Sequence, residues 1–224
     1  MIKNIILFII FIFFFIFSDI TFAKVEKTNI GFSIDVPSDL ILVERKNYEE
    51  VKKVVNYIPE SKKRLLSEAE IKSIENDNEK VEKYFRRYEI GGYIMFGLIP
   101  KPPMNYNLHN IAFSKLEKID FSKAINDKKF LATICSEILK SVQGQGSSMK
   151  NIKIDSCKID KDKFKNFNQT IKINYDMSKI TDKFYYEGYL FNFNNYLISV
   201  ELISEKQNYH ILDRQLLSLV NSIK

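Results

Sequence analysis

The C-terminal half of the chain contains two runs of alternating residues separated by a two-residue break, and this pattern limits the fold most strongly. The first run extends over residues 184–193, Asn194-Asn195 follows it, and the second run extends over residues 196–203. A two-residue break matches a tight hairpin, and asparagine tolerates the positive φ that such turns require. Alternate side chains of a strand point to opposite faces, and in the first run both sets include apolar residues. The sequence therefore predicts an antiparallel sheet that is covered on two sides.

Two apolar stripes predict helices that cover this sheet. Asp127 is a candidate N-cap for a stripe at helical spacing that continues to Val142. A second stripe, which continues to Ile223, follows Ser204 and Gln207 at the spacing of a capping box. Further short runs with strand patterns are residues 28–36, 40–43, 88–100, 110–119, 151–159 and 167–175. This order of elements predicts an α+β protein in which an antiparallel β-sheet is flanked by helices.

The N-terminal residues have the composition of an export signal. Lys3 precedes an unbroken apolar run over residues 5–17, and Thr21-Phe22-Ala23 has small residues at the two positions that a signal peptidase reads. A membrane anchor is the alternative, but thirteen apolar residues span only about 20 Å of a hydrocarbon core of about 30 Å. We expect residues 1–23 to be a signal peptide and the protein to be periplasmic or secreted. It would touch the membrane only through this segment, if the segment stays uncleaved.

The remaining residues, 24–224, are enough for one domain with a substantial hydrophobic core and too few for two domains of that kind. They open with GFSIDVPSDL, residues 31–40, in which apolar and polar residues alternate until Pro37. We expect this segment to form the first strand of the sheet. Residues of about 47–87 then show helical spacing and dense charge, with Ser67 and Glu70 in a capping box. We interpret that region as a charged helical excursion within a single domain, and we expect its residues 60–87 to be solvated on the surface.

Two cysteines are present, Cys135 and Cys157. In an oxidising compartment the pair can form a disulfide, and closing an interval of 22 residues would stabilise the fold by about 3 kcal/mol in the chain-entropy model. The alternative is two buried free thiols, because cysteine is among the most buried residue types. The sequence leaves both alternatives open, since it does not show whether the two sites meet.

Three short motifs resemble those of the PsbP-like fold family, which includes the photosystem extrinsic protein, a Ran-binding relative and bacterial envelope proteins. The motifs are GFSIDVPSDL, the group Tyr185-Glu187-Gly188-Tyr189 before the hairpin, and the terminal LLSLVNSIK with Val220, Ser222 and Ile223. The resemblance implies an α/β/α sandwich and a role in binding or assembly rather than catalysis. The chain departs from the family pattern in its longer charged region and in having Leu40 nearest to the place of a frequent tryptophan.

The sequence contains no local pattern of catalytic residues. The two histidines, His109 and His210, have no neighbours at metal-ligand or nucleophile spacing, and the glycines lack the context of a phosphate-binding loop. Asp155, Asp160 and Asp162 lack the spacing of an EF-hand, which favours a solvated loop. We therefore predict no catalytic, cofactor-binding or metal-binding residues and no cofactor. A small hydrolase that uses His109 or His210 is the alternative.

Aromatic residues of two predicted strands are candidates for an apolar groove that would hold a lipid, a peptide or a hydrophobic partner segment. These residues are Tyr88, Tyr93, Phe96, Tyr185, Tyr189 and Phe191. The alternative interpretation is that they form the ordinary core of the sheet.

The formal net charge of +6 gives little reason to expect a nucleic-acid partner. Charges of both signs are mixed along the chain, an AT-rich genome would produce the same lysine-rich composition, and an exported protein rarely meets nucleic acid. We expect an exported, non-enzymatic envelope protein that acts as a binding, chaperone-like or assembly factor for an unknown protein or lipid partner. The alternative is a secreted protein that acts on a host or neighbouring cell surface.

Overall fold

The computed structural model describes residues 23–89, 94–105, 109–117, 127–144, 150–167, 169–178, 181, 183–194 and 196–224. The predicted signal peptide, apart from its last residue, and Tyr93 of the predicted groove lie outside the described residues. Within the described ranges, no helix is long and apolar enough to cross a membrane.

The strands of the described chain are β1 (Lys24–Lys27), β2 (Ser33–Val36), β3 (Leu40–Val43), β4 (Ile94–Pro100), β5 (Asn110–Glu117), β6 (Lys153–Asp160), β7 (Thr170–Asp176), β8 (Phe184–Phe193) and β9 (Tyr196–Glu205). The helices are α2 (Tyr48–Val55), α3 (Glu60–Lys63), α4 (Glu68–Glu75), α5 (Asn78–Arg86), α7 (Lys128–Gly144) and α8 (Tyr209–Asn221), with a 3₁₀ turn at Arg45–Asn47 before α2.

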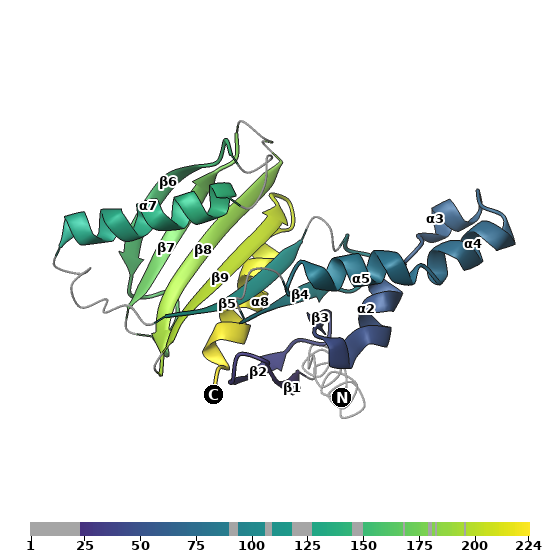
Figure 1. The fold of residues 1–224 in the computed structure, drawn as a ribbon, viewed down its shortest axis with the longest axis horizontal. Helices are drawn as coiled ribbons and strands as arrows, with labels where there is room; N and C mark the ends of the chain where they lie inside the picture. The colour runs from purple at the N-terminus through teal and green to yellow at the C-terminus, as the bar shows by residue number, and fades with distance from the viewer. Residues whose placement is uncertain are drawn as a thin grey trace, which may run out of the picture.

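Seven of the described strands form one antiparallel sheet in the order β3-β4-β5-β9-β8-β7-β6 (Figure 1). Its longest pairing is the predicted hairpin of β8 and β9, which runs in register from Phe184↔Glu205 to Phe193↔Tyr196. Asn194 in the turn has φ of 53°, a left-handed value that asparagine tolerates. The predicted α+β architecture, an antiparallel sheet flanked by helices, is confirmed.

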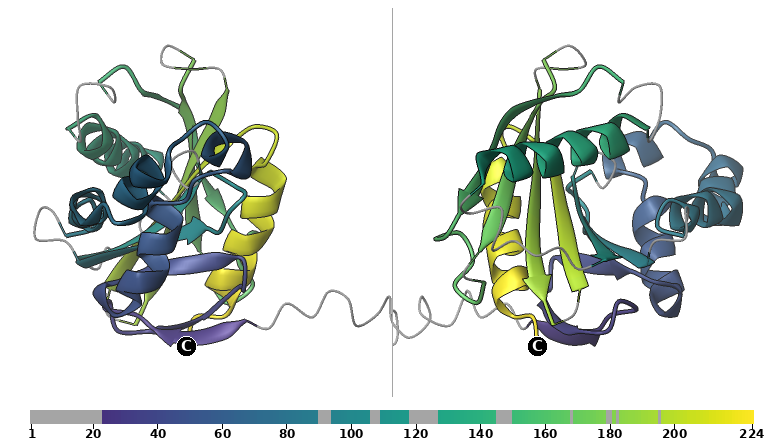
Figure 2. Two further views of the ribbon diagram at one scale, coloured as in Figure 1. Left: turned by 90° about the vertical axis from the view of Figure 1, so that its right-hand side faces the viewer. Right: turned by 60° about the vertical axis from the view of Figure 1, so that its left-hand side comes forward.

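The two faces of the sheet are covered differently, and α7 and α8 lie on opposite sides of it (Figure 2). One face packs on α8 and on the β1–β2 hairpin in a continuous core that includes Phe96, Phe113 and Phe191. The other face carries two separate clusters, one beneath α7 on β6 to β9 and one beneath α2 and α5 on β3 and β4. The predicted cap of α7 is present, because Asp127 Oδ1 accepts hydrogen bonds from the backbone N–H groups of Lys129 and Phe130 at 2.8 and 3.2 Å.

Apart from Leu40, which begins β3, the GFSIDVPSDL segment lies outside the main sheet, so the prediction that it forms the first strand of that sheet is wrong. Its strand β2 pairs with β1 in a separate two-stranded sheet. The backbone of Ser33 also exchanges two hydrogen bonds of 3.1 Å with that of Lys224, the last residue of the chain. The backbone groups of β2 are therefore satisfied by both ends of the described chain, and the main sheet begins after Pro37 with β3.

The charged region of residues 47–87 begins with α2, whose valines are buried, and the rest of it divides into two parts. Helices α3 and α4 have no buried residues and extend away from the sheet (Figure 1), and α4 begins with the predicted capping box of Ser67 and Glu70. Helix α5 instead buries Val81, Tyr84 and Phe85. The prediction of a solvated excursion is therefore wrong for α5, because its three apolar residues at helical spacing form an inward stripe.

Candidate functional site

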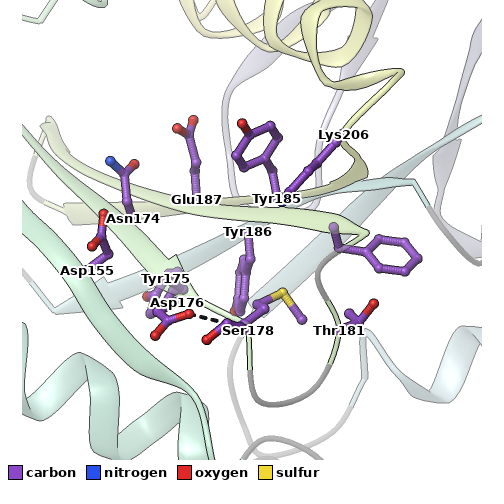
Figure 3. Close-up of a pocket in the computed structure, with 12 residues that line it drawn as sticks. Asp155, Asn174, Tyr175, Asp176, Ser178, Thr181, Tyr185, Tyr186, Glu187 and Lys206 are labelled. Carbon is purple, nitrogen blue, oxygen red and sulfur yellow. Dashed lines mark hydrogen bonds between the residues drawn. The ribbon is translucent and has the colours of Figure 1, made fainter.

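A pocket of about 290 Å³ lies near one end of the sheet, where β7 ends and β8 begins (Figure 3). Strands β6, β7 and β8, the β7–β8 connection and the residue after β9 contribute to it. The lining combines aromatic, carboxylate and amide side chains: Asp155, Asn174, Tyr175, Asp176, Met177, Ser178, Thr181, Phe184, Tyr185, Tyr186, Glu187 and Lys206.

A β-bulge in the edge strand β6 places the first of these carboxylates. Ile154 pairs with Tyr175 and Ser156 pairs with Asn174, so Asp155 has no partner of its own in the ladder. Bulges bend a strand and re-aim a side chain, and Asp155 lies beside Asn174 at the pocket (Figure 3). It is exposed and has no ion-pair partner among the described residues. Its position in β6 agrees with the strand predicted over residues 151–159, so Asp155 is solvated as predicted but does not lie in a loop.

Asn174 contributes an acceptor that the described residues leave unsatisfied. Its Nδ2 donates a hydrogen bond of 2.9 Å to Ser156 Oγ, while its Oδ1 is buried and accepts no hydrogen bond within the described part of the chain. A buried acceptor without a donor costs free energy. This oxygen is therefore disposed to accept a hydrogen bond from water or from a bound molecule.

Glu187 forms the rigid, charged wall of the pocket. Its Oε1 lies 2.9 Å from Lys172 Nζ, and its Oε2 accepts hydrogen bonds from the hydroxyls of Tyr189 and Tyr209 at 2.6 and 2.7 Å. Burial by itself would raise the pKa of this carboxyl, but the hydrogen bonds from Tyr189, Lys172 and Tyr209 together outweigh burial and lower its pKa. Glu187 therefore stays ionised, and the network connects the pocket to α8.

Two buried tyrosines line the pocket on the α7 side of the sheet. The rings of Tyr175 and Tyr186 stack with centroids 4.3 Å apart. Burial, and then the negative charge of Glu201, raise the pKa of both hydroxyls. The Tyr186 hydroxyl therefore stays protonated and donates a hydrogen bond of 2.9 Å to Glu201 Oε2.

Tyr185 is the exposed aromatic residue of the pocket. It is 46 % exposed, and its ring packs against that of Tyr209 at a centroid distance of 4.9 Å. The Nζ of Lys206 lies 5.6 Å from the centroid of the Tyr185 ring. The exposed ring of Tyr185 is thus available to a ligand, and the ammonium group of Lys206 already lies near this ring.

The aromatic residues that the sequence suggested as a groove do not form one site. Phe96, Tyr189 and Phe191 are buried in the core on the α8 face. Tyr88 belongs to the cluster beneath α2 and α5 on the opposite face, and Tyr185 alone is exposed. Strands β4 and β8 are three positions apart in the sheet, roughly 14 Å at the usual strand spacing. The alternative of an ordinary sheet core therefore describes most of this set.

The two histidines, the candidates for a hydrolase, have different surroundings. His210 is exposed at the start of α8. The side chain of His109 is only 1 % exposed, with Nδ1 3.1 Å from Ser204 Oγ and Nε2 3.6 Å from Glu205 Oε2. Burial lowers the pKa of His109, and the charge of Glu205 opposes this effect.

Ser204, His109 and Glu205 bring together the residue types of a hydrolytic triad, but the serine is not presented to a substrate. Ser204 is fully buried in β9, and its hydroxyl donates a hydrogen bond of 3.0 Å to the backbone oxygen of Glu205. Because it lies in the strand, it also does not cap α8, and the predicted capping box with Gln207 is wrong; Asn208 occupies the N-cap position. In the described part of the chain, no group of three or more His, Cys, Asp or Glu side chains could hold a metal ion.

A disulfide joins Cys135 of α7 to Cys157 of β6, with the Cα atoms 6.3 Å apart. Strand β6 is an edge strand that pairs only with β7 among the described strands. The bridge therefore attaches the strand that carries the Asp155 bulge to the helix above it. Of the two alternatives for the cysteines, the structure contains the bridged form.

No family model matches the chain, and no curated protein matches it in sequence. Among solved structures, cyanobacterial PsbP (CyanoP) from Synechocystis sp. PCC 6803 is similar to 93 % of this chain over 95 % of its own, with a TM-score of 0.50 and 9 % identity. The Ran-binding protein Mog1p from Saccharomyces cerevisiae aligns over 90 % of this chain and 94 % of its own, with a TM-score of 0.44 and 9 % identity. At this identity the first likeness is evidence of fold, and with the antiparallel sheet between helices it gives the chain the PsbP-like fold.

Proposed function

We propose that the protein is an exported, non-enzymatic binding protein of a bacterial envelope, which acts as a chaperone-like or assembly factor and holds its partner at the pocket between β6, β7 and β8. The observation that carries this proposal is the combination, in one pocket, of exposed Tyr185 with two acceptors: the exposed carboxylate of Asp155 and the buried Asn174 Oδ1, which lacks a donor among the described residues. Pockets of this size that combine aromatic surface with a few convergent polar groups are typical binding sites.

The charged and hydrogen-bonded groups around the pocket support binding rather than catalysis. Glu187 is fully engaged by three donors, so its lowered pKa makes it a poor general base at neutral pH. The serine with a histidine neighbour, Ser204, is fully buried and is not one of the residues that line the pocket. The composition of residues 1–23 supports export, and the motifs that resemble the PsbP-like family support a binding or assembly role.

Site-specific photo-cross-linking in intact cells tests this proposal. A photoreactive phenylalanine analogue replaces Tyr185 in one variant and Tyr196 in another, because these tyrosines are 46 % and 44 % exposed and lie at opposite ends of the same hairpin. We expect a defined cross-linked partner from position 185 and little from position 196. Equal yields of cross-linked partner from both positions, or no cross-linked partner from position 185, would contradict a binding site at the pocket.

Cell fractionation tests the location separately. Recovery of the protein mainly from the periplasm supports the proposal. Recovery mainly from the culture medium supports the alternative of a secreted protein that acts on another cell.

A further inference from the structure

The pocket has a local charge opposite to that of the whole protein. The chain has a formal net charge of +6, yet the described lining contains three carboxylates, Asp155, Asp176 and Glu187, and one cation, Lys206. The charge of Glu187 is balanced by Lys172, which lies 2.9 Å away. Asp155 has no such partner among the described residues, so a negative charge remains at the mouth of the pocket.

The uncharged groups of the pocket favour the same kind of ligand. Asn174 Oδ1 is a buried acceptor that lacks a donor, and it lies beside Asp155. The ring of Tyr185 presents an exposed aromatic surface, and the negative face of such a ring attracts cations within about 6 Å of its centroid. A carboxylate, an unsatisfied carbonyl and an aromatic face together complement a positively charged group that carries several N–H donors.

Lys206 shows how such a group would sit. Its ammonium nitrogen lies 5.6 Å from the Tyr185 ring centroid, so the chain already places a cation against this ring at the pocket rim. The Lys206 side chain is exposed and has no ion-pair partner among the described residues, although its backbone N–H is fixed by a hydrogen bond of 2.9 Å to the backbone oxygen of Lys183. A long, exposed lysine side chain can leave the ring while its backbone stays in place.

On the basis of the binding role proposed above, we propose that this pocket binds an organic cation, namely the ammonium or guanidinium group of a lysine or arginine side chain or of a small amine. The cation would contact the Asp155 carboxylate and Asn174 Oδ1 and would pack on the Tyr185 ring. Lys206 would move aside and would oppose binding by charge repulsion. An anionic ligand would meet the reverse pattern, because Asp155 would repel it and Lys206 would attract it.

Chemical-shift titration of the full chain with small probes tests the charge requirement. The probes are N-acetyl-arginine amide and N-acetyl-citrulline amide, which have almost the same shape and differ in charge. We expect the arginine probe to shift the backbone amide signals of β6, β7 and β8 around the pocket, and the citrulline probe to bind about tenfold more weakly or not at all. Equal binding of the two probes, or no shift at the pocket with either, would overturn the proposal.

Two variants at the rim of the pocket give a second test, because one removes a negative charge and the other removes a positive charge, and their effects on affinity should be opposite. We expect Asp155→Asn to lower the affinity for the arginine probe by about threefold and Lys206→Gln to raise that affinity by about threefold. Effects of this size are typical of partly screened surface charges. Lys72→Gln, on the distant helix α4, is the matched control for the loss of one positive charge and should change nothing. Unchanged affinity in both rim variants, or the reverse order, would contradict a cationic ligand. All three side chains are exposed, so the fold should survive each change.

A comparison of free arginine with N-acetyl-arginine amide, the blocked probe, distinguishes between two sources of the cation, a side chain of a protein and a small molecule. Tighter binding of the blocked form supports a side chain within a protein segment, and tighter binding of free arginine supports a small molecule. These titrations are also independent of the cross-linking test. An adduct from position 185 without any preference for cations would preserve the binding role and overturn only the ligand class.

Discussion

The two ends of strand β8 share one face of the sheet but have different surroundings. At one end Tyr189 and Phe191 are fully buried, and Phe191 packs against Phe164 and Phe167 at centroid distances of 5.8 and 4.2 Å. At the other end Tyr185 is exposed. One alternating strand is thus buried in the core at one end and exposed at the other, because its two ends are covered differently.

The buried end should account for the largest loss of stability. Phe191→Ala removes a fully buried ring from the core on the α8 face. We expect the free energy of unfolding to fall by about 3–5 kcal/mol, the usual cost of a large aromatic truncation in a core. Urea denaturation followed by tyrosine fluorescence measures this. A loss below 1 kcal/mol would contradict the assignment of this end of β8 to the core.

The disulfide should have the next largest effect, because it attaches the edge strand of the pocket to α7. The double variant Cys135→Ser and Cys157→Ser removes a bridge that spans 22 residues. We expect a loss of about 3 kcal/mol in the chain-entropy model. Thermal unfolding of the variant and of the oxidised protein gives the comparison. An unchanged Tm would mean that the bridge does not constrain the edge strand.

Glu187 lies between the two ends and should have an intermediate effect that depends on pH. Glu187→Gln leaves Lys172 without its partner, and we expect a loss of about 2 kcal/mol at pH 7, as for a hydrogen-bonded charged group. Because the folded protein lowers the pKa of this carboxyl, its ionised form stabilises the fold above the ordinary value of 4.5. That stabilisation disappears as the pH falls through the lower folded value. Urea titrations from pH 7 to 3 should therefore show the gap between wild type and variant closing, and a constant gap would contradict the assigned pKa direction.

The exposed end should have the smallest effect on stability. Tyr185→Ser removes a ring that is 46 % exposed, and we expect the free energy of unfolding to change by no more than about 0.5 kcal/mol. The same substitution should abolish the binding of the arginine probe. Strong destabilisation by Tyr185→Ser would place this residue in the core and remove the difference between the two ends.

Local patterns were enough to predict most elements of the fold. The hairpin of β8 and β9, the strand β3, the cap of α7 at Asp127 and the capping box of α4 at Ser67 all depend on residues close in sequence, and all are present. Two of the errors arise where distant segments decide the outcome. Strand β2 forms a local hairpin with β1, but its other edge exchanges backbone hydrogen bonds with the C-terminal Lys224 instead of joining the main sheet. Ser204 hydrogen-bonds with His109 at a separation of 95 residues and does not cap a helix.

The pocket was missed for the same reason. The bulge at Asp155 is visible only in the register of β6 against β7, and the alternation of β6 gives no signal of it. Tyr185 was identified as a candidate, but strand alternation could not show that it would be exposed while Tyr189 and Phe191 would be buried. Asp155 and Lys206 line the same pocket only because strands β6 to β9 lie side by side in the sheet, and the two charged residues lie at opposite sides of that pocket (Figure 3).

The ratio of cross-linking yields from positions 185 and 196 in intact cells is the most direct test of the difference between the two ends of the hairpin. Both tyrosines are exposed to a similar extent, so exposure by itself gives a ratio near one. We predict a yield from position 185 that is several-fold higher and that falls when Asp155→Asn is introduced. Equal yields from the two positions would contradict the claim that the pocket end of β8 is the site of binding.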